Sequence, residues 1–154
     1  MAPKLSAFLL CFASFASAQM KEKIHYFPLE TVKLSESVFS KAMAADHKYL
    51  MALEPDRLLA PYLKEAGLKP KANNYPNWEN TGLDGHIGGH YISALSLMYA
   101  STGDPAVQQR IDYMISELAR CQNTSPDGYI SGIPDGKKSG KKLNRETFVL
   151  QASV

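Results

Sequence analysis

Cysteine is scarce in this sequence, and one of the two cysteines lies in a segment that we expect to be removed. Among 154 residues only Cys11 and Cys121 are cysteine. Cys11 lies in the apolar run 7–15, which follows a basic residue and precedes the small residues 16–18; this pattern predicts a cleaved secretory signal over residues 1–18. The mature chain would keep Cys121 alone, which excludes an intramolecular disulfide and a cysteine-rich metal site. We therefore expect a secreted or periplasmic protein.

Long apolar runs and extended basic patches are also missing. The run at 7–15 is too short to span a bilayer and no later segment is apolar enough, so we expect no membrane partner after the signal is cleaved. Residues 137–154 hold five bases and one acid, whereas residues 19–136 hold eleven bases and fourteen acids. This basic tail is not interleaved with aromatic residues on a patterned face, so the sequence predicts no nucleic-acid partner. The tail itself is predicted to be disordered.

Apolar residues recur at helical spacing in four segments of the mature chain. The predicted helices cover residues 37–53, 55–67 and 86–100, and a fourth begins after the N-cap Asp104 and Pro105. Ser35 or Ser37 is the expected cap of the first helix, and the second is expected to break at Pro61 and stop at Gly67. The predicted buried stripes are Val38, Ala42, Ala45, Tyr49 and Leu53; Ile87, Tyr91, Ala94, Leu95 and Met98; and Val107, Ile111, Met114, Ile115 and Leu118.

The connections between these helices differ in length and composition. Residues 67–84 are rich in Pro, Asn and Gly and show no period, which predicts a long loop of the kind that is often functional. The connection 101–104 is short, so the helices on either side should run antiparallel. Residues 122–136 are rich in turn signals and have room for a small hairpin. The predicted fold class is all-α, built from helical hairpins that form either a small bundle or part of a larger toroid.

The stretch 83-LDGHIGGHYISALSLMYA-100 places His86 and His90 one helical turn apart with two glycines between them. Zinc proteases use such a histidine pair with a glutamate after the first histidine, but Ile87 holds that position here, so a metal site is the weakest of three hypotheses. In the second, both imidazoles bind a polar ligand and the glycines make room for it. In the third, the histidines are structural and the glycines allow close helix packing.

The preceding loop favours a carbohydrate as the ligand. Aromatic rings pack against the CH faces of sugars, and carboxylates, amides and imidazoles bind their hydroxyls. The predicted substrate-binding residues are Trp78, Glu79, Asp84, His86, His90 and Tyr91. Alternatively, Trp78 fills a core beneath the loop. Glu79 and Asp84 could form a hydrolase pair, but we favour Asp84 as the N-cap of the third helix.

The chain resembles glycoside hydrolase family 127, the β-L-arabinofuranosidase-like proteins, from about residue 34 to about residue 136. The resemblance rests on the elements PDRLLAP, WE, GLDGHIGGHY, LMYASTGD and DGYI taken together. It implies an (α/α)₆ toroid, of which residues 19–136 would form the first part, and the retaining removal of L-arabinofuranose from plant-type oligosaccharides. It also implies a zinc-bound cysteine nucleophile and a glutamate acid/base in the later part of the domain.

We expect none of those catalytic or zinc-binding positions in this chain, and therefore no catalytic residue and no cofactor. Residues 137–154 look foreign to the family, so the leading hypothesis is a truncated N-terminal fragment of an exported glycosidase that contributes substrate-pocket residues and lacks the catalytic centre. The alternative hypothesis is a small secreted, non-catalytic carbohydrate-binding or interaction module.

Overall fold

The computed structural model describes residues 26–138, and all of its regular elements are helical. The predicted signal segment 1–18 and most of the predicted tail, residues 139–154, lie outside the described residues. The α-helices are α1 (Val38–Ala52), α2 (Pro55–Glu65), α3 (His86–Thr102) and α4 (Pro105–Asn123), and the short 3₁₀ helices are η1 (Leu29–Thr31) and η2 (Asn77–Asn80). The all-α prediction is confirmed.

Local capping residues fix where α1 and α4 begin. The Ser37 hydroxyl accepts the backbone N–H of Ser40, whose own hydroxyl accepts the N–H of Ser37 in return, a reciprocal capping box. Asp104 accepts the N–H of Ala106, and Pro105 occupies the first helical position of α4, where a missing N–H costs nothing. The predicted starts of these helices are therefore confirmed.

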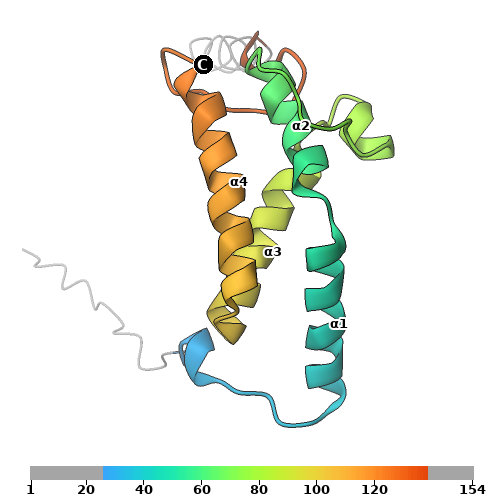
Figure 1. Cartoon of the computed structure of the whole chain (residues 1–154), viewed down its shortest axis with the longest axis vertical. Coiled ribbons are helices and arrows are strands. Elements are labelled where there is room, and N and C mark those ends of the chain that lie inside the picture. The colour runs from blue at the N-terminus through green and yellow to red at the C-terminus, as the bar shows by residue number, and fades with distance from the viewer. Residues whose placement is uncertain (1–25, 139–154) are drawn as a thin grey trace, which may run out of the picture.

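The four helices form an elongated arrangement in which α3 and α4 pack side by side (Figure 1). Helices α1 and α2 follow one another along the long axis, and the chain then returns through α3 and rises again through α4 (Figure 1). Only Gly103 and Asp104 separate α3 from α4, and Gly103 adopts the left-handed conformation, φ 69°, that ends α3. The predicted antiparallel pair is thus present as a helical hairpin.

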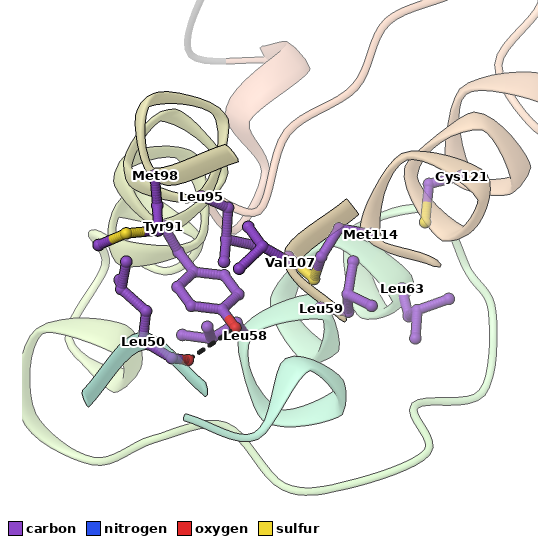
Figure 2. Packing of buried hydrophobic residues seen from close by; sticks show 10 residues of the cluster. All are labelled: Leu50, Leu58, Leu59, Leu63, Tyr91, Leu95, Met98, Val107, Met114 and Cys121. Atoms are coloured by element: carbon purple, nitrogen blue, oxygen red, sulfur yellow. Dashed lines mark hydrogen bonds between the residues drawn. The ribbon is translucent and has the colours of Figure 1, made fainter. Parts of the chain in front are cut away.

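The hydrophobic core lies where α2, α3 and α4 meet, and α1 adds to it near its end (Figure 2). Burying one aliphatic side chain in such a core stabilises the folded state by about 1.5–3 kcal/mol. The buried cluster consists of Leu50, Leu58, Leu59, Leu63, Tyr91, Leu95, Met98, Val107, Met114 and Cys121. It includes members of the stripes predicted for α3 and α4, although Ile87 and Ile115 of those stripes are exposed.

Most of the predicted buried face of α1 is wrong, although Leu53 at its end does pack against the core. Val38 and Tyr49 are 73% and 62% exposed, whereas Met43 and Leu50, which share a different face, contact the core. The pattern misleads because α1 packs against the core through the face of Met43 and Leu50, so Val38 and Tyr49 on the predicted face stay exposed.

Pro61 does not break α2 as predicted. It lies buried within the helix, which continues to Glu65. A Cβ built on Gly132 would lie 3.0 Å from the Cβ of Pro61, so the proline ring is closely packed from outside the helix. This burial offsets the hydrogen bond that the missing N–H removes.

The structure of residues 26–138 also bears on the predicted hairpin and on membrane-spanning segments. No strand occurs there, so the hairpin predicted within 122–136 is absent. No helix in this range is both long and apolar enough to cross a membrane.

Candidate functional site

Three segments meet near the start of α3. The loop 67–84 leads into it, α2 lies against it, and the segment 124–138 approaches it through Gly132. A Cβ on Gly132 would lie 2.7 Å from the Cα of Gly85, so only glycine fits this backbone contact. The three segments therefore form one continuous end of the molecule.

Polar contacts fix the loop to the helices on both sides. The Arg57 side chain donates to the backbone oxygens of Asn73 and Asn74 and stacks over the ring of Tyr75 at 4.0 Å from its centroid. Lys71 donates to the hydroxyl of Tyr113, 2.8 Å away, and pairs with Glu117 of α4 at 3.0 Å. A loop held from α2 and α4 in this way presents its side chains in a defined geometry.

Glu79 caps the start of α3 from within the loop. It is fully buried, and its Oε2 accepts the N–H of Gly85 at 2.8 Å while its Oε1 accepts the N–H of Ile87 at 2.7 Å. The first N–H groups of a helix have no partner inside the helix and carry partial positive charge, so a buried carboxylate there is doubly favourable. Glu79 thereby fixes the direction of the turn that carries His86.

Asp84 is not the N-cap of α3, contrary to prediction. The N-cap is Gly85, with φ 85°, and no side chain of its own can cap the helix. The Asp84 carboxylate instead accepts the N–H of Gly82 at 3.0 Å and the amide of Asn74 at 3.2 Å. The same Asn74 amide donates to the backbone oxygen of Glu79 at 2.8 Å, so Asp84 belongs to the network that shapes the loop.

Trp78, His86 and His90 form an exposed row of rings beside this buried network. Trp78 is 62% exposed, and its ring centroid lies 6.2 Å from that of His86. The centroids of His86 and His90 are 4.6 Å apart with the rings nearly perpendicular. We call these three residues the aromatic row. Trp78 does not fill a core beneath the loop, so that alternative is wrong.

The two glycines between the histidines serve different purposes. Gly88 is buried against α2: a Cβ there would lie 3.0 Å from the Tyr62 ring and 3.1 Å from the Leu58 carbonyl. Close helix packing, one of the two proposed roles, is therefore confirmed for Gly88. Gly89 is exposed, and a Cβ there would meet only the Tyr62 hydroxyl at 3.9 Å.

Tyr91 is not part of the aromatic row, because its side chain lies within the hydrophobic core (Figure 2). It is 2% exposed, its hydroxyl donates to the backbone oxygen of Leu50 at 3.0 Å, and it accepts from Arg110 at the same distance. Burial raises the pKa of the Tyr91 phenol, and the Arg110 guanidinium partly opposes that rise. Tyr91 thus holds α3 against the end of α1.

Sequence reasoning missed Tyr62, which joins α2 to the start of α3. Its hydroxyl donates to the backbone oxygen of Gly85 at 2.6 Å. Burial, and then the nearby charge of Glu79, raise the pKa of the Tyr62 phenol. No local pattern marks this residue, because its partner lies 23 positions further along the chain.

Metal ligands and nucleophiles are not gathered in the described part of the chain. Residues 26–138 contain no group of three or more His, Cys, Asp or Glu side chains placed to hold a metal ion. Cys121 is buried, and this burial, followed by the charge of Glu117, raises the pKa of its thiol. The described residues therefore do not fit a zinc-bound thiolate, and the zinc site that the resemblance implies stays a prediction.

His47 forms a contact between elements that are far apart in the sequence. Its Nε2 lies 2.7 Å from the Oδ2 of Asp104, the N-cap of α4, so it links α1 to the α3–α4 turn. The His47–Asp104 pair is distant in sequence from the aromatic row. His47 can therefore serve as a control for experiments on His86 and His90.

Comparison with known protein families gives one match. Residues 31–152 match the family described as Beta-L-arabinofuranosidase, GH127 catalytic domain. The match includes the aromatic row and all four α-helices, and it extends beyond residue 136, where the motifs noted in the sequence end. No curated protein matches the chain.

Proposed function

Because the chain belongs to glycoside hydrolase family 127, whose substrates are carbohydrates, we propose that it is part of an exported β-L-arabinofuranosidase. In this proposal its role is to bind the glycan substrate. The ligand is an L-arabinofuranose-containing oligosaccharide of plant type, and the contacts come from Trp78, His86 and His90. The observation that carries this proposal is the exposure of all three rings in one row beside a rigid, buried carboxylate network.

The chemistry of the aromatic row suits a sugar ring. The indole face of Trp78 offers an apolar surface to the CH groups of a furanose. Each neutral imidazole has one donor and one acceptor, which matches the hydroxyl group. Within residues 26–138, neither His86 nor His90 makes a side-chain hydrogen bond, so both retain this capacity for a ligand.

In this proposal Glu79, Asp84 and Tyr91, the other three predicted substrate-binding residues, hold the aromatic row in place. Glu79 and Asp84 fix the loop and the first turn of α3, and Tyr91 fixes the helix to the core. All three are buried. Their contact with a sugar remains a prediction, whereas their hydrogen bonds explain how the aromatic row keeps its geometry.

We assign binding and not bond cleavage to this region. Both carboxylate oxygens of Glu79 accept backbone N–H groups, and both oxygens of Asp84 also accept hydrogen bonds. A general acid needs a carboxyl proton to donate, and a nucleophile must approach the sugar. Buried carboxylates whose two oxygens both hold structural hydrogen bonds are poorly suited to either task.

A fluorescence titration tests the proposal because Trp78 is the only tryptophan in the chain. Adding a β-L-arabinofuranosyl oligosaccharide to the purified chain should give a saturable change in emission. His90→Ala should abolish it, while His47→Ala, a histidine variant elsewhere in the molecule, should respond like wild type. The absence of a response in the folded wild-type chain would refute the proposal.

A hydrolysis assay tests whether the purified chain only binds the glycan or also cleaves it. The account expects binding without release of L-arabinose by the purified chain. Release at enzymatic rates would show that the chain itself cleaves the bond, and would overturn the assignment of this region to binding. A non-catalytic carbohydrate-binding module would give the same binding and no release, with no need for a catalytic partner.

A further inference from the structure

A hollow lies at the same end of the molecule, outside the aromatic row. It measures about 220 Å³ and is bounded by the ends of α2 and α4 and by the segment 124–138, which Figure 1 shows above both helices. Tyr62 lines this hollow and also contacts Gly85, which precedes His86, and Gly88, which lies between His86 and His90. We call it the Tyr129 pocket, after the aromatic residue in its wall.

The wall of the Tyr129 pocket combines polar side chains with the rings of Tyr62 and Tyr129 and with smaller apolar residues. Glu65 and Lys137 contribute one negative and one positive charge, and Ser125 and Ser131 contribute hydroxyls. Lys137 donates to Ser125 at 3.1 Å and to Asp127 at 2.8 Å, which joins the turn after α4 to the following segment. The wall is therefore a connected structure and not a set of independent surface side chains.

Polar groups in the wall of the Tyr129 pocket keep hydrogen-bonding capacity that a ligand can use. Glu65 uses its Oε2 to accept the N–H of Asp135 at 3.1 Å, and its Oε1 makes no hydrogen bond within residues 26–138. A lysine ammonium has three donors, of which two are used by Ser125 and Asp127. A Cβ on Gly136 would lie 2.7 Å from the Tyr129 hydroxyl, so a glycine is needed there for the tyrosine to keep its place.

These features define the chemistry of the ligand. Opposite charges in the wall give no net preference for an anion or a cation, and hydroxyls beside an aromatic ring suit a neutral polyhydroxylated ring. Drug-sized ligands occupy pockets of about 300 Å³ or more, so a hollow of about 220 Å³ fits a single sugar ring. We propose that the Tyr129 pocket is a second subsite, which takes one neutral sugar residue of the glycan bound at the aromatic row.

This inference rests on the proposed function for its choice of ligand, but its test reads a different part of the chain. The backbone amide signals of Tyr129 and Ser131 are followed by NMR in the full chain during addition of a β-L-arabinofuranosyl oligosaccharide, while Trp78 fluorescence is recorded in parallel. Saturable shifts of both amides support the second subsite. If these amides do not move at saturating oligosaccharide, the subsite is refuted, and the Trp78 signal shows separately whether the aromatic row binds.

A matched pair of variants tests the role of the ring. Tyr129→Phe keeps the aromatic face and should bind with nearly wild-type affinity, whereas Tyr129→Leu should weaken binding by about fivefold or more, since an aromatic contact contributes about 1 kcal/mol. Equal affinity for the two variants would contradict the proposal. If Tyr129→Leu does not fold, Glu65→Ala against Glu65→Gln gives the same comparison for the carboxylate side, with weaker binding expected for the alanine variant.

Discussion

The Oε1 of Glu79 accepts the backbone N–H of Ile87 at 2.7 Å, and this bond connects the loop before α3 to the first turn of that helix. The other oxygen of the same carboxylate holds Gly85. His86 lies between these two anchored residues, and Trp78 precedes Glu79 in η2. One buried carboxylate thus fixes the backbone next to both rings, which is why the aromatic row has a defined shape.

Removal of the Glu79 carboxylate should destabilise the folded chain. Glu79→Ala leaves the N–H groups of Gly85 and Ile87 without their acceptor, and each buried unsatisfied group costs about 1–3 kcal/mol. We expect the free energy of unfolding, measured by urea denaturation, to fall by about 3 kcal/mol. Glu36→Ala, at an exposed acid before α1, should change it by less than about 0.5 kcal/mol. Equal effects of the two variants would show that Glu79 has no capping role.

The two glycines of the histidine motif should respond in opposite ways to alanine. Gly88→Ala places a methyl group 3.1 Å from the Leu58 carbonyl, which forces α2 and α3 apart and should cost about 1–3 kcal/mol. Gly89→Ala meets nothing closer than 3.9 Å and should stabilise the helix by about 1 kcal/mol. Thermal or urea unfolding of the two variants measures both signs. Destabilisation by Gly89→Ala would mean that the helix packs differently there.

The Tyr91 hydroxyl should contribute measurably to the link between α1 and α3. Tyr91→Phe removes the donor to the Leu50 carbonyl and the acceptor for Arg110, so we expect a loss of about 1–2 kcal/mol in the free energy of unfolding. Tyr49→Phe provides the control, because that ring is 62% exposed. A Tyr91→Phe variant as stable as wild type would contradict the assigned role.

Low pH should weaken the N-cap of α4, and the variant Asp104→Asn should reveal this effect. The N–H of Ala106, and after it His47, hold the pKa of Asp104 below its ordinary value. A carboxyl group whose pKa is lower in the folded state stabilises the fold above its unfolded pKa, and that contribution is lost as the pH falls through the folded value. Below about pH 4 the free energy of unfolding should therefore fall more steeply in wild type than in Asp104→Asn.

Urea unfolding at a series of pH values between about pH 5 and about pH 2 tests this difference. Asp46→Asn is a suitable control, since Asp46 is exposed and makes no hydrogen bond within residues 26–138. Parallel pH profiles for wild type and Asp104→Asn would contradict the expected linkage.

The parts of the fold that sequence predicts are those set by neighbouring residues. Ser37, Asp104 and Pro105 act within one helical turn, so they mark the starts of α1 and α4 correctly. Most of the buried face of α1 was predicted wrongly because it depends on which distant surface covers the helix, and that surface contacts Met43, Leu50 and Met51.

The same distinction applies to the candidate site. The composition of the loop indicated which residues gather near α3, but it did not reveal that Glu79 points inward while Trp78 points outward. Asn77, the first residue of η2, has a φ of 64°, a conformation that asparagine tolerates better than most residues, and loop composition alone does not predict such a backbone. The Tyr62–Gly85 and His47–Asp104 contacts join residues far apart in sequence, so periodicity carries no signal for them.

The most direct test of sugar binding at the aromatic row is the indole N–H signal of Trp78 in a proton–nitrogen NMR spectrum. The chain has one tryptophan, so one indole signal reports on this surface alone. The account predicts that a β-L-arabinofuranosyl oligosaccharide shifts this signal saturably in wild type and leaves it in place in His90→Ala. An indole signal that stays fixed in the folded wild-type chain at saturating oligosaccharide would contradict the account.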